Sequence, residues 1–182
     1  MSVEKTEKPK RKNTSKKKGN GFELTVAKLL SKELAPMNFI RTPGSGARVG
    51  GKNFATIGQM FGEEALKIFV GDVVPVNEKQ IGKKFKVSCE CKFYATQDHF
   101  TSVMMGSGLI FKWMKESEDD AQKIDKLPVL IFKWNHTPIF IACTSDNMPV
   151  DCIKMILPRE NLPSIKVGIL EEVLKHKDFW IE

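Results

Sequence analysis

The sequence predicts an α/β fold, in which short β-strands alternate with amphipathic helices. Apolar residues recur at helical spacing in residues 21–35 and 101–123. Short apolar runs typical of strands occur at residues 39–41, 68–74, 85–92, 129–134 and 138–142. The chain has 182 residues, of which 41% are apolar, and this suits a single domain with a sizeable core.

The first predicted helix runs from about Gly21 to Ala35 and is closed by Pro36. Asn20 precedes it as an expected N-cap. Glu23 falls on the side of this helix that faces the protein, where an acid is unusual. Two interpretations stay open: Glu23 forms a capping box with Asn20, or it faces a metal site.

A strand at residues 39–41 leads into a loop that suits phosphate binding. The loop is rich in glycine and carries Arg41, Ser45, Arg48 and Lys52, whose charges and neighbouring backbone amides suit an anion. It lacks the G-x-x-x-x-G-K-[ST] pattern of a P-loop. An ordinary connector has the same composition, so the pattern alone leaves both interpretations open.

The next two strands carry acids and a lysine. Asp72 lies on the strand at 68–74, and the polar segment 77–84 predicts a turn that joins this strand to 85–92 as an antiparallel hairpin. Alternation places Glu90 and Lys92 on the face opposite the apolar residues. Asp72 and Glu90 then converge within bridging distance of a Mg²⁺ ion that polarises a phosphodiester. The alternative is a surface Glu–Lys pair.

The second half of the chain predicts a helix at 101–123, interrupted at 106–108, and two strands around a turn at Asn135-His136. The apolar stripe of this helix is typical of core or of a dimer contact. A C-terminal helix is expected from Ser164 to His176, and the apolar end, residues 179–181, is expected to dock on the domain.

Positive charge is concentrated in a basic arm at residues 1–18. The arm has a net charge of +6, nearly all of the total of +7. It has too few apolar residues to fold alone, so we expect it to be disordered when free and to contact a nucleic acid through residues that include Lys16, Lys17 and Lys18. The alternative is a solubilising terminus or a localisation-like basic cluster. The four cysteines are expected to be reduced and buried, and no segment suits a membrane span or signal peptide, which predicts a soluble, cytoplasmic protein.

The order of these elements resembles the PD-(D/E)XK nuclease superfamily, and within it the archaeal-type Holliday junction resolvases and similar proteins common in phage genomes. Five segments carry the resemblance: Lys18-Gly19 with Phe22-Glu23, residues 39–47, residues 71–75, residues 87–92 and residues 127–133. The chain departs from the archaeal resolvases by extra residues between Ala47 and Ile68, by a tail beyond Ser145, and by Gly71-Asp72 in place of Pro-Asp.

The resemblance implies a restriction-endonuclease-like core with a central mixed β-sheet flanked by helices. It assigns residues 19–145 to this core and leaves 146–182 as a helical extension packed on it. Asp72 and Glu90 would bind Mg²⁺, for which Mn²⁺ substitutes, and Glu23 would complete the site. Lys92 would position the attacking water, and Ser45 would lie near the scissile strand.

The implied activity is Mg²⁺-dependent hydrolysis of branched DNA by a homodimer, in recombination or repair. A sequence-specific restriction or homing-type nuclease that cuts duplex DNA and a non-catalytic DNA-binding protein are the alternatives. Retention of the four residues Glu23, Asp72, Glu90 and Lys92 argues against a pure binder, because acids at the binding surface repel phosphate.

Overall fold

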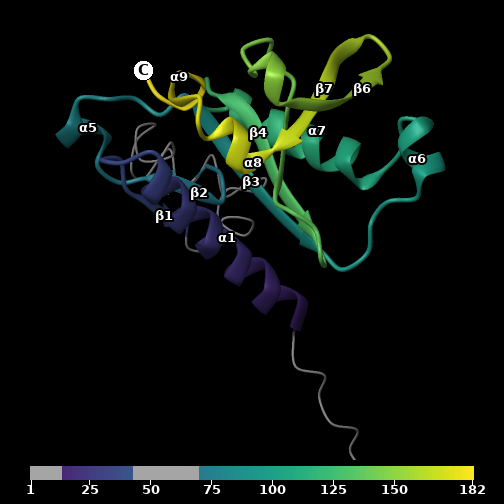
Figure 1. Cartoon of the computed structure of the whole chain (residues 1–182), viewed down its shortest axis with the longest axis horizontal. Coiled ribbons are helices and arrows are strands. Elements are labelled where there is room, and N and C mark those ends of the chain that lie inside the picture. The colour runs from purple at the N-terminus through teal and green to yellow at the C-terminus, as the bar shows by residue number, and fades with distance from the viewer. Residues whose placement is uncertain (1–13, 43–69) are drawn as a thin grey trace, which may run out of the picture.

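The computed structural model describes residues 14–42 and 70–182, with side chains from residue 17 onward (Figure 1). Seven strands form one sheet in the order β1-β2-β3-β4-β5-β7-β6. The strands are β1 (Phe39–Arg41), β2 (Val73–Pro75), β3 (Val87–Tyr94), β4 (Leu127–Trp134), β5 (Phe140–Cys143), β6 (Ile153–Arg159) and β7 (Leu162–Ile169). The parallel pair β3 and β4 lies among antiparallel pairs, so the predicted mixed sheet is confirmed.

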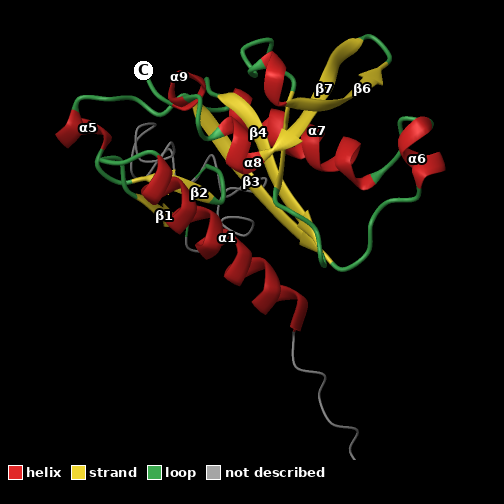
Figure 2. Ribbon diagram, viewed as in Figure 1, coloured by secondary structure: helices red, strands yellow, loops and turns green. Residues whose placement is uncertain are grey.

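Helices cover both faces of the sheet (Figure 2). The helical segments are α1 (Thr14–Glu33), α5 (Glu78–Ile81), α6 (Phe100–Met104), α7 (Leu109–Gln122), η1 (Val150–Cys152), α8 (Leu170–Val173) and α9 (Lys177–Trp180). On β4, Val129 and Ile131 belong to the core beneath α1, α8 and α9, whereas Leu130 and Phe132 belong to the core beneath α7. Strands buried on both faces in this way have continuous apolar runs in their sequence.

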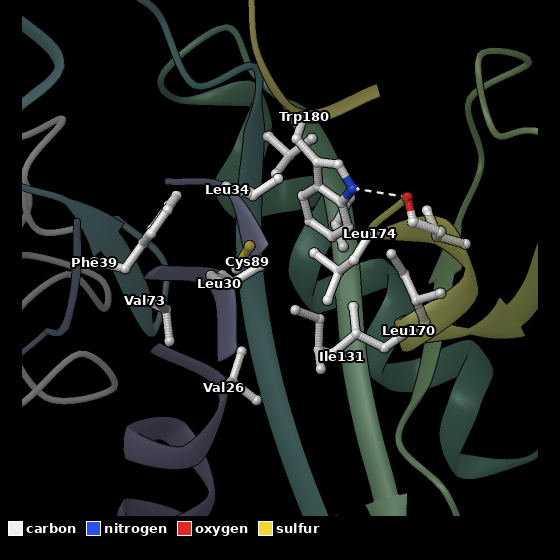
Figure 3. Packing of buried hydrophobic residues seen from close by; sticks show 14 of the residues in the cluster. Val26, Leu30, Leu34, Phe39, Val73, Cys89, Ile131, Leu170, Leu174 and Trp180 are labelled. Atoms are coloured by element: carbon white, nitrogen blue, oxygen red, sulfur yellow. Dashed lines mark hydrogen bonds between the residues drawn. The ribbon is translucent and has the colours of Figure 1, made fainter. Parts of the chain in front are cut away.

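The core beneath α1 also holds the C-terminus in place (Figure 3). Trp180 is fully buried, and its indole Nε1 donates a 3.1 Å hydrogen bond to the carbonyl of Val173. Ile181 forms a backbone bridge with Phe85, just before β3. The predicted docking of residues 179–181 is therefore confirmed.

Helix α1 begins earlier than predicted, at Thr14 rather than Gly21. Asn20 and Glu23 are therefore interior residues of the helix, and the predicted capping box is wrong. Lysines 16–18 extend the helix because long unbranched side chains favour it. Residues 14–18, which the sequence assigned to the basic arm, belong to α1, and residues 1–13 lie outside the described part of the chain.

The predicted antiparallel hairpin of the two acid-bearing strands is confirmed, with Val73 opposite Cys89. Strand β2 begins only at Val73, so Asp72 lies just before it rather than within it. The connection contains the short helix α5, which ends at Gly82 with a φ of 64°, in the left-handed region that glycine adopts without strain.

The predicted helix from Ser164 to His176 is wrong in its first half, because residues 164–169 belong to the inner strand β7 and the helix α8 covers only residues 170–173. Ile165 and Val167 alternate with Lys166, which is the two-residue period of a strand, and both apolar side chains are buried. Strands β6 and β7 form a hairpin that extends the sheet beyond β5. The region after Ser145 therefore combines a β-hairpin with the short helical segments η1, α8 and α9, and is not the helical extension that was expected.

Several other predictions are confirmed. The helical segment at 101–123 is divided into α6 and α7 around residues 106–108, and β4 and β5 flank a turn at which His136 has a φ of 60°. The four cysteines are free and buried. Within the described ranges 14–42 and 70–182, no helix has both the length and the apolar composition that a bilayer span requires.

Candidate active site

The candidate site forms at the edge of β3, where Asp72 is fixed by the backbone. The Asp72 N–H donates a 2.7 Å hydrogen bond to the carbonyl of Cys89, and Asp72 Oδ2 accepts a 2.8 Å hydrogen bond from the N–H of Cys91. The carboxylate thus accepts a backbone hydrogen bond of the kind that a carbonyl of a neighbouring strand accepts elsewhere in the sheet. Asp72 is only 7% exposed.

Gly71 explains why the chain departs from the Pro-Asp of the superfamily. Its φ is 90°, whereas proline is restricted to about −65°. A Cβ at this position would lie 3.1 Å from the carbonyl oxygen of Cys89. Glycine therefore provides both the backbone conformation and the close approach that bring Asp72 against β3.

Glu90 and Lys92 lie side by side on β3, as predicted. Lys92 Nζ is 2.6 Å from Glu90 Oε1 and 3.1 Å from Oε2 of Glu116 on α7. The side chains of Glu90 and Lys92 are 16% and 24% exposed, so the pair lies in a partly buried position rather than on an open surface. Glu116 was not predicted from the sequence, because the register of α7 against β3 is a tertiary property that helical spacing does not specify.

Glu23 approaches the same region from α1. Its carboxylate accepts a hydrogen bond from Nε of Arg41, and Nη2 of Arg41 donates a 2.9 Å bond to Oδ1 of Asn20. Arg41, predicted to contact DNA, is therefore engaged with two residues of α1 in this structure. Asn20 supports Arg41 instead of capping the helix.

The electrostatics link the three acids. Burial raises the pKa of Glu90 to about 7, and the charge of Asp72 contributes to this rise, although Lys92 opposes it. Burial also raises the pKa of Glu23; the hydrogen bond from Arg41 opposes this, and the charge of Asp72 adds to it. Burial alone would lower the pKa of Lys92, but Glu90 and Glu116 outweigh it and raise that pKa.

This shared negative potential fits a divalent cation. Carboxylate oxygens are the ligands that Mg²⁺ prefers, and an ion bound by Asp72 and Glu90 would favour their charged forms. The acids do not form a closed cage, however. In the described part of the chain, three ligand atoms within 4.8 Å of one another occur at a different cluster, Asp151, Cys152 and His176. At the nuclease-like site, Arg41 and Lys92 pair with Glu23 and Glu90.

A cleft of about 740 Å³ adjoins Lys92. It is lined by Lys18, Gly19, Cys91, Lys92, Phe93, Tyr94, Ala95, Thr96, Gln97 and Leu109. Lys18 Nζ lies 5.3 Å from the centre of the Phe93 ring, and Tyr94 is 46% exposed. The cleft therefore offers a cation and aromatic surface beside the acids.

The structure describes only some of the residues predicted to bind DNA. Lys18 lines the cleft, and Lys17 is exposed on α1. The side chain of Lys16, together with Ser45, Arg48, Lys52 and the 47–68 insertion, lies outside the described residues.

A family model described as "Phage putative PDDEXK endonuclease" matches residues 14–175. The chain belongs to this family. The match runs from the first residue of α1 past the end of α8, and so contains all of the sheet and the four residues Glu23, Asp72, Glu90 and Lys92. Searches among curated proteins and among solved structures gave no match.

Membership in this endonuclease family confirms the predicted PD-(D/E)XK superfamily and agrees with the observed sheet. Glu90-Cys91-Lys92 has the acid-x-lysine spacing that the superfamily's name describes, and Asp72 is the acid that precedes it. The structure brings these three residues together at one strand edge, and Glu23 interacts electrostatically with Asp72 and Lys92.

Proposed function

We propose that the protein is a Mg²⁺-dependent DNA endonuclease that acts on branched DNA, as Holliday junction resolvases do. The observation that carries the proposal is the meeting of Asp72, Glu90 and Lys92 at the edge of β3, beside an open cleft. Glu90, whose pKa is raised by burial and by the charge of Asp72 and which contacts a lysine, has the perturbed environment that clusters at catalytic centres.

In this proposal Asp72 and Glu90 hold the ion, and Glu23 completes the site directly or through water. Bound Mg²⁺, or Mn²⁺ in its place, makes a water nucleophilic near neutral pH and stabilises charge on the leaving oxygen. Lys92 would position the attacking water and stabilise the charge that develops on the phosphate. Ser45 is proposed to lie near the scissile strand.

The cleft suggests how DNA reaches the site. Lys18 at its wall and Lys17 on α1 provide positive charge for the phosphate backbone. The exposed ring of Tyr94 offers a stacking surface for a base that is not paired. Flaps contain such bases, and base pairs at the branch point of an open four-way junction have faces without a stacked neighbour, so this surface favours branched DNA over uninterrupted duplex. A homodimer would present two sites for symmetric cuts.

Cleavage of matched substrates tests the proposal. A labelled four-way junction, a flap and a linear duplex of the same sequence are incubated with the protein and Mg²⁺, Mn²⁺ or EDTA, with Asp72→Asn as the inactive control. We expect Mg²⁺-dependent cuts near the branch point and little cleavage of the duplex.

Two outcomes would replace the proposal by an alternative. Cleavage of the linear duplex at one defined site, without preference for branches, indicates a restriction-type nuclease. Binding of all three substrates without cleavage under any of the metal conditions indicates a DNA-binding protein. Mass photometry of the junction complex measures the expected two chains per junction.

A further inference from the structure

A second cluster of metal-binding side chains lies away from the nuclease-like site. Asp151 and Cys152 belong to η1, just before the edge strand β6, and His176 lies between α8 and α9. One ligand atom from each of the three side chains lies within 4.8 Å of the other two.

The fold fixes both chain segments that supply this cluster. Cys152 is 2% exposed, and its carbonyl oxygen packs so closely on Gly168 of β7 that a Cβ there would lie 2.6 Å away. The backbone N–H of His176 donates a 3.1 Å hydrogen bond to the carbonyl of Val173, and its carbonyl accepts a 3.1 Å bond from the N–H of Phe179. The cluster is therefore held by core packing on one side and by the α8–α9 turn on the other.

The separation of His176 and Asp151 suits two ligands of one ion better than a direct ion pair. Nε2 of His176 is 3.4 Å from Oδ2 of Asp151, whereas charge-assisted hydrogen bonds are about 2.7–2.9 Å long. Two ligand atoms bound to one tetrahedral Zn²⁺ at roughly 2.0–2.3 Å lie roughly 3.3–3.7 Å apart. The observed separation falls within that range.

We propose that Asp151, Cys152 and His176 form a Zn²⁺ site that joins η1 to the C-terminal segment. Thiolate and imidazole ligands favour Zn²⁺ over Mg²⁺, which binds oxygen almost alone. The side chains of Asp151 and His176 are 72% and 40% exposed, so an ion reaches the buried sulfur from solvent, and water completes the tetrahedron.

The surrounding charges agree with this site. Cys152 is 2% exposed, and a thiolate buried in this way requires a cation beside it. Lys154 does not supply it directly, because its Nζ is paired with Glu172 at 2.8 Å. Binding of Zn²⁺ transfers the thiol proton to solvent and forms the Zn–S bond, so charge and protons balance.

Co²⁺ substitution tests the site by a readout that is independent of DNA cleavage. The full chain carries Asp72→Asn, which weakens the nuclease-like site, and is freed of metal with a chelator before titration with Co²⁺ and then Zn²⁺. We expect one equivalent of Co²⁺ to produce the ultraviolet thiolate-to-cobalt absorption band, and one equivalent of Zn²⁺ to abolish it. Competition with a chromophoric chelator gives the Zn²⁺ affinity.

Two variants and one matched control complete the test. Cys152→Ser should remove the band, and His176→Asn should weaken Zn²⁺ binding by more than the roughly 10- to 100-fold decrease that follows removal of an outer-shell partner. The control His136→Asn changes an exposed histidine that lies outside the cluster, in the turn between β4 and β5, and should leave binding unchanged.

His176 is partly exposed, so its variant is expected to fold even if Cys152→Ser does not. Absence of the band in the parent chain, its survival in Cys152→Ser, or equal Zn²⁺ affinity of His176→Asn and His136→Asn would overturn the proposal and leave a surface His–Asp pair.

Discussion

The carboxylate of Asp72 accepts a 2.8 Å hydrogen bond from the backbone N–H of Cys91, the residue between Glu90 and Lys92. One side chain therefore completes the edge of β3 and lies beside the two residues proposed for catalysis. The fold and the site depend on the same contact. The buried N–H of Cys91 at the edge of β3 needs a hydrogen-bond acceptor, and the Asp72 carboxylate provides it.

This hydrogen bond predicts different outcomes for two substitutions of Asp72. In Asp72→Asn the amide oxygen still accepts the Cys91 N–H, so we expect the fold to be retained and cleavage to be abolished, with DNA binding intact or tighter. Asp72→Ala leaves that buried N–H unpaired and should also lower the unfolding free energy by about 1–3 kcal/mol. Cleavage and urea-unfolding assays measure the two effects. Undiminished cleavage by purified Asp72→Asn would show that Asp72 is not a metal ligand.

Lys92 and Lys112 form a matched pair, because both lie near Glu116, at 3.1 Å and 4.0 Å. Lys92→Ala should lower the single-turnover rate on the order of 10² or more, as expected for one preorganised group that stabilises transition-state charge. Lys112→Ala, on the exposed side of α7, should leave the rate unchanged. Equal rates for the two variants would return Lys92 to the role of a structural ion-pair partner.

Glu23 has no capping role, since it lies within α1 and binds Arg41. Glu23→Gln should therefore change the melting temperature little and lower Mg²⁺ affinity, about 10- to 100-fold if it acts through water. Glu33→Gln, at the far end of the same helix, is the control. The cleavage rate of each variant is measured as a function of Mg²⁺ concentration, and the two Mg²⁺ affinities are compared. A lowered melting temperature with normal Mg²⁺ dependence would assign Glu23 a structural role.

The raised pKa of Glu90 predicts a pH-dependent stability. Between an unfolded pKa near 4.5 and a folded pKa of about 7, the native state binds more protons than the unfolded state. Its unfolding free energy therefore falls as pH rises through this window, on the order of 1–3 kcal/mol relative to Glu90→Gln. The pKa of Glu23 is raised in the wild-type protein and in Glu90→Gln alike, so its contribution cancels in the difference between their unfolding free energies.

Urea unfolding at a series of pH values, with and without Mg²⁺, measures this difference. Mg²⁺ should reduce the loss of stability above pH 7, because the ion favours the charged carboxylate. Parallel pH profiles of the wild-type protein and Glu90→Gln, in the absence of metal, would contradict the assigned shift.

Much of the site was predictable because strand alternation is a local rule. It placed Glu90 and Lys92 together on β3, and the short polar connection between the acid-bearing strands placed Asp72 opposite them. The ion pairs of Arg41 and Glu116 could not be assigned in this way. Their partners come from other elements, and the packing of helices on the sheet decides which side chains meet.

The errors in the fold have equally specific causes. Asn20 resembles an N-cap, but the helix continues through it into the lysines before it, although Gly19 and Gly21 on either side are weak helix formers. Ile165 and Val167 have strand alternation, but the leucines and glutamates that follow indicate a helix, and β7 ends where that helix begins. Boundaries between elements were the weak point in both cases.

The basic segment before α1 is expected to bind DNA through its charge. Residues 14–18 belong to the helix, so deletion of residues 2–13 removes charge without cutting a described element. We expect weaker DNA binding at low salt and a shallower dependence of log K on log[salt], with a slope reduced by roughly 0.9 for each duplex phosphate that is no longer neutralised. Because the acids and Lys92 lie outside the deletion, saturating DNA should restore most of the cleavage rate.

The deletion both removes charge and shortens the chain. A charge-neutral variant of full length distinguishes these two effects. All seven charged residues of this segment become glutamine: Glu4, Lys5, Glu7, Lys8, Lys10, Arg11 and Lys12. Because counterion release depends on charge, the variant should have the same reduced salt slope as the deletion. An unchanged slope in both proteins would mean that this segment does not touch DNA in the complex. A cleavage rate that stays low at saturating DNA would mean that the segment also acts after binding, for example by holding the substrate in the cleft beside Lys18.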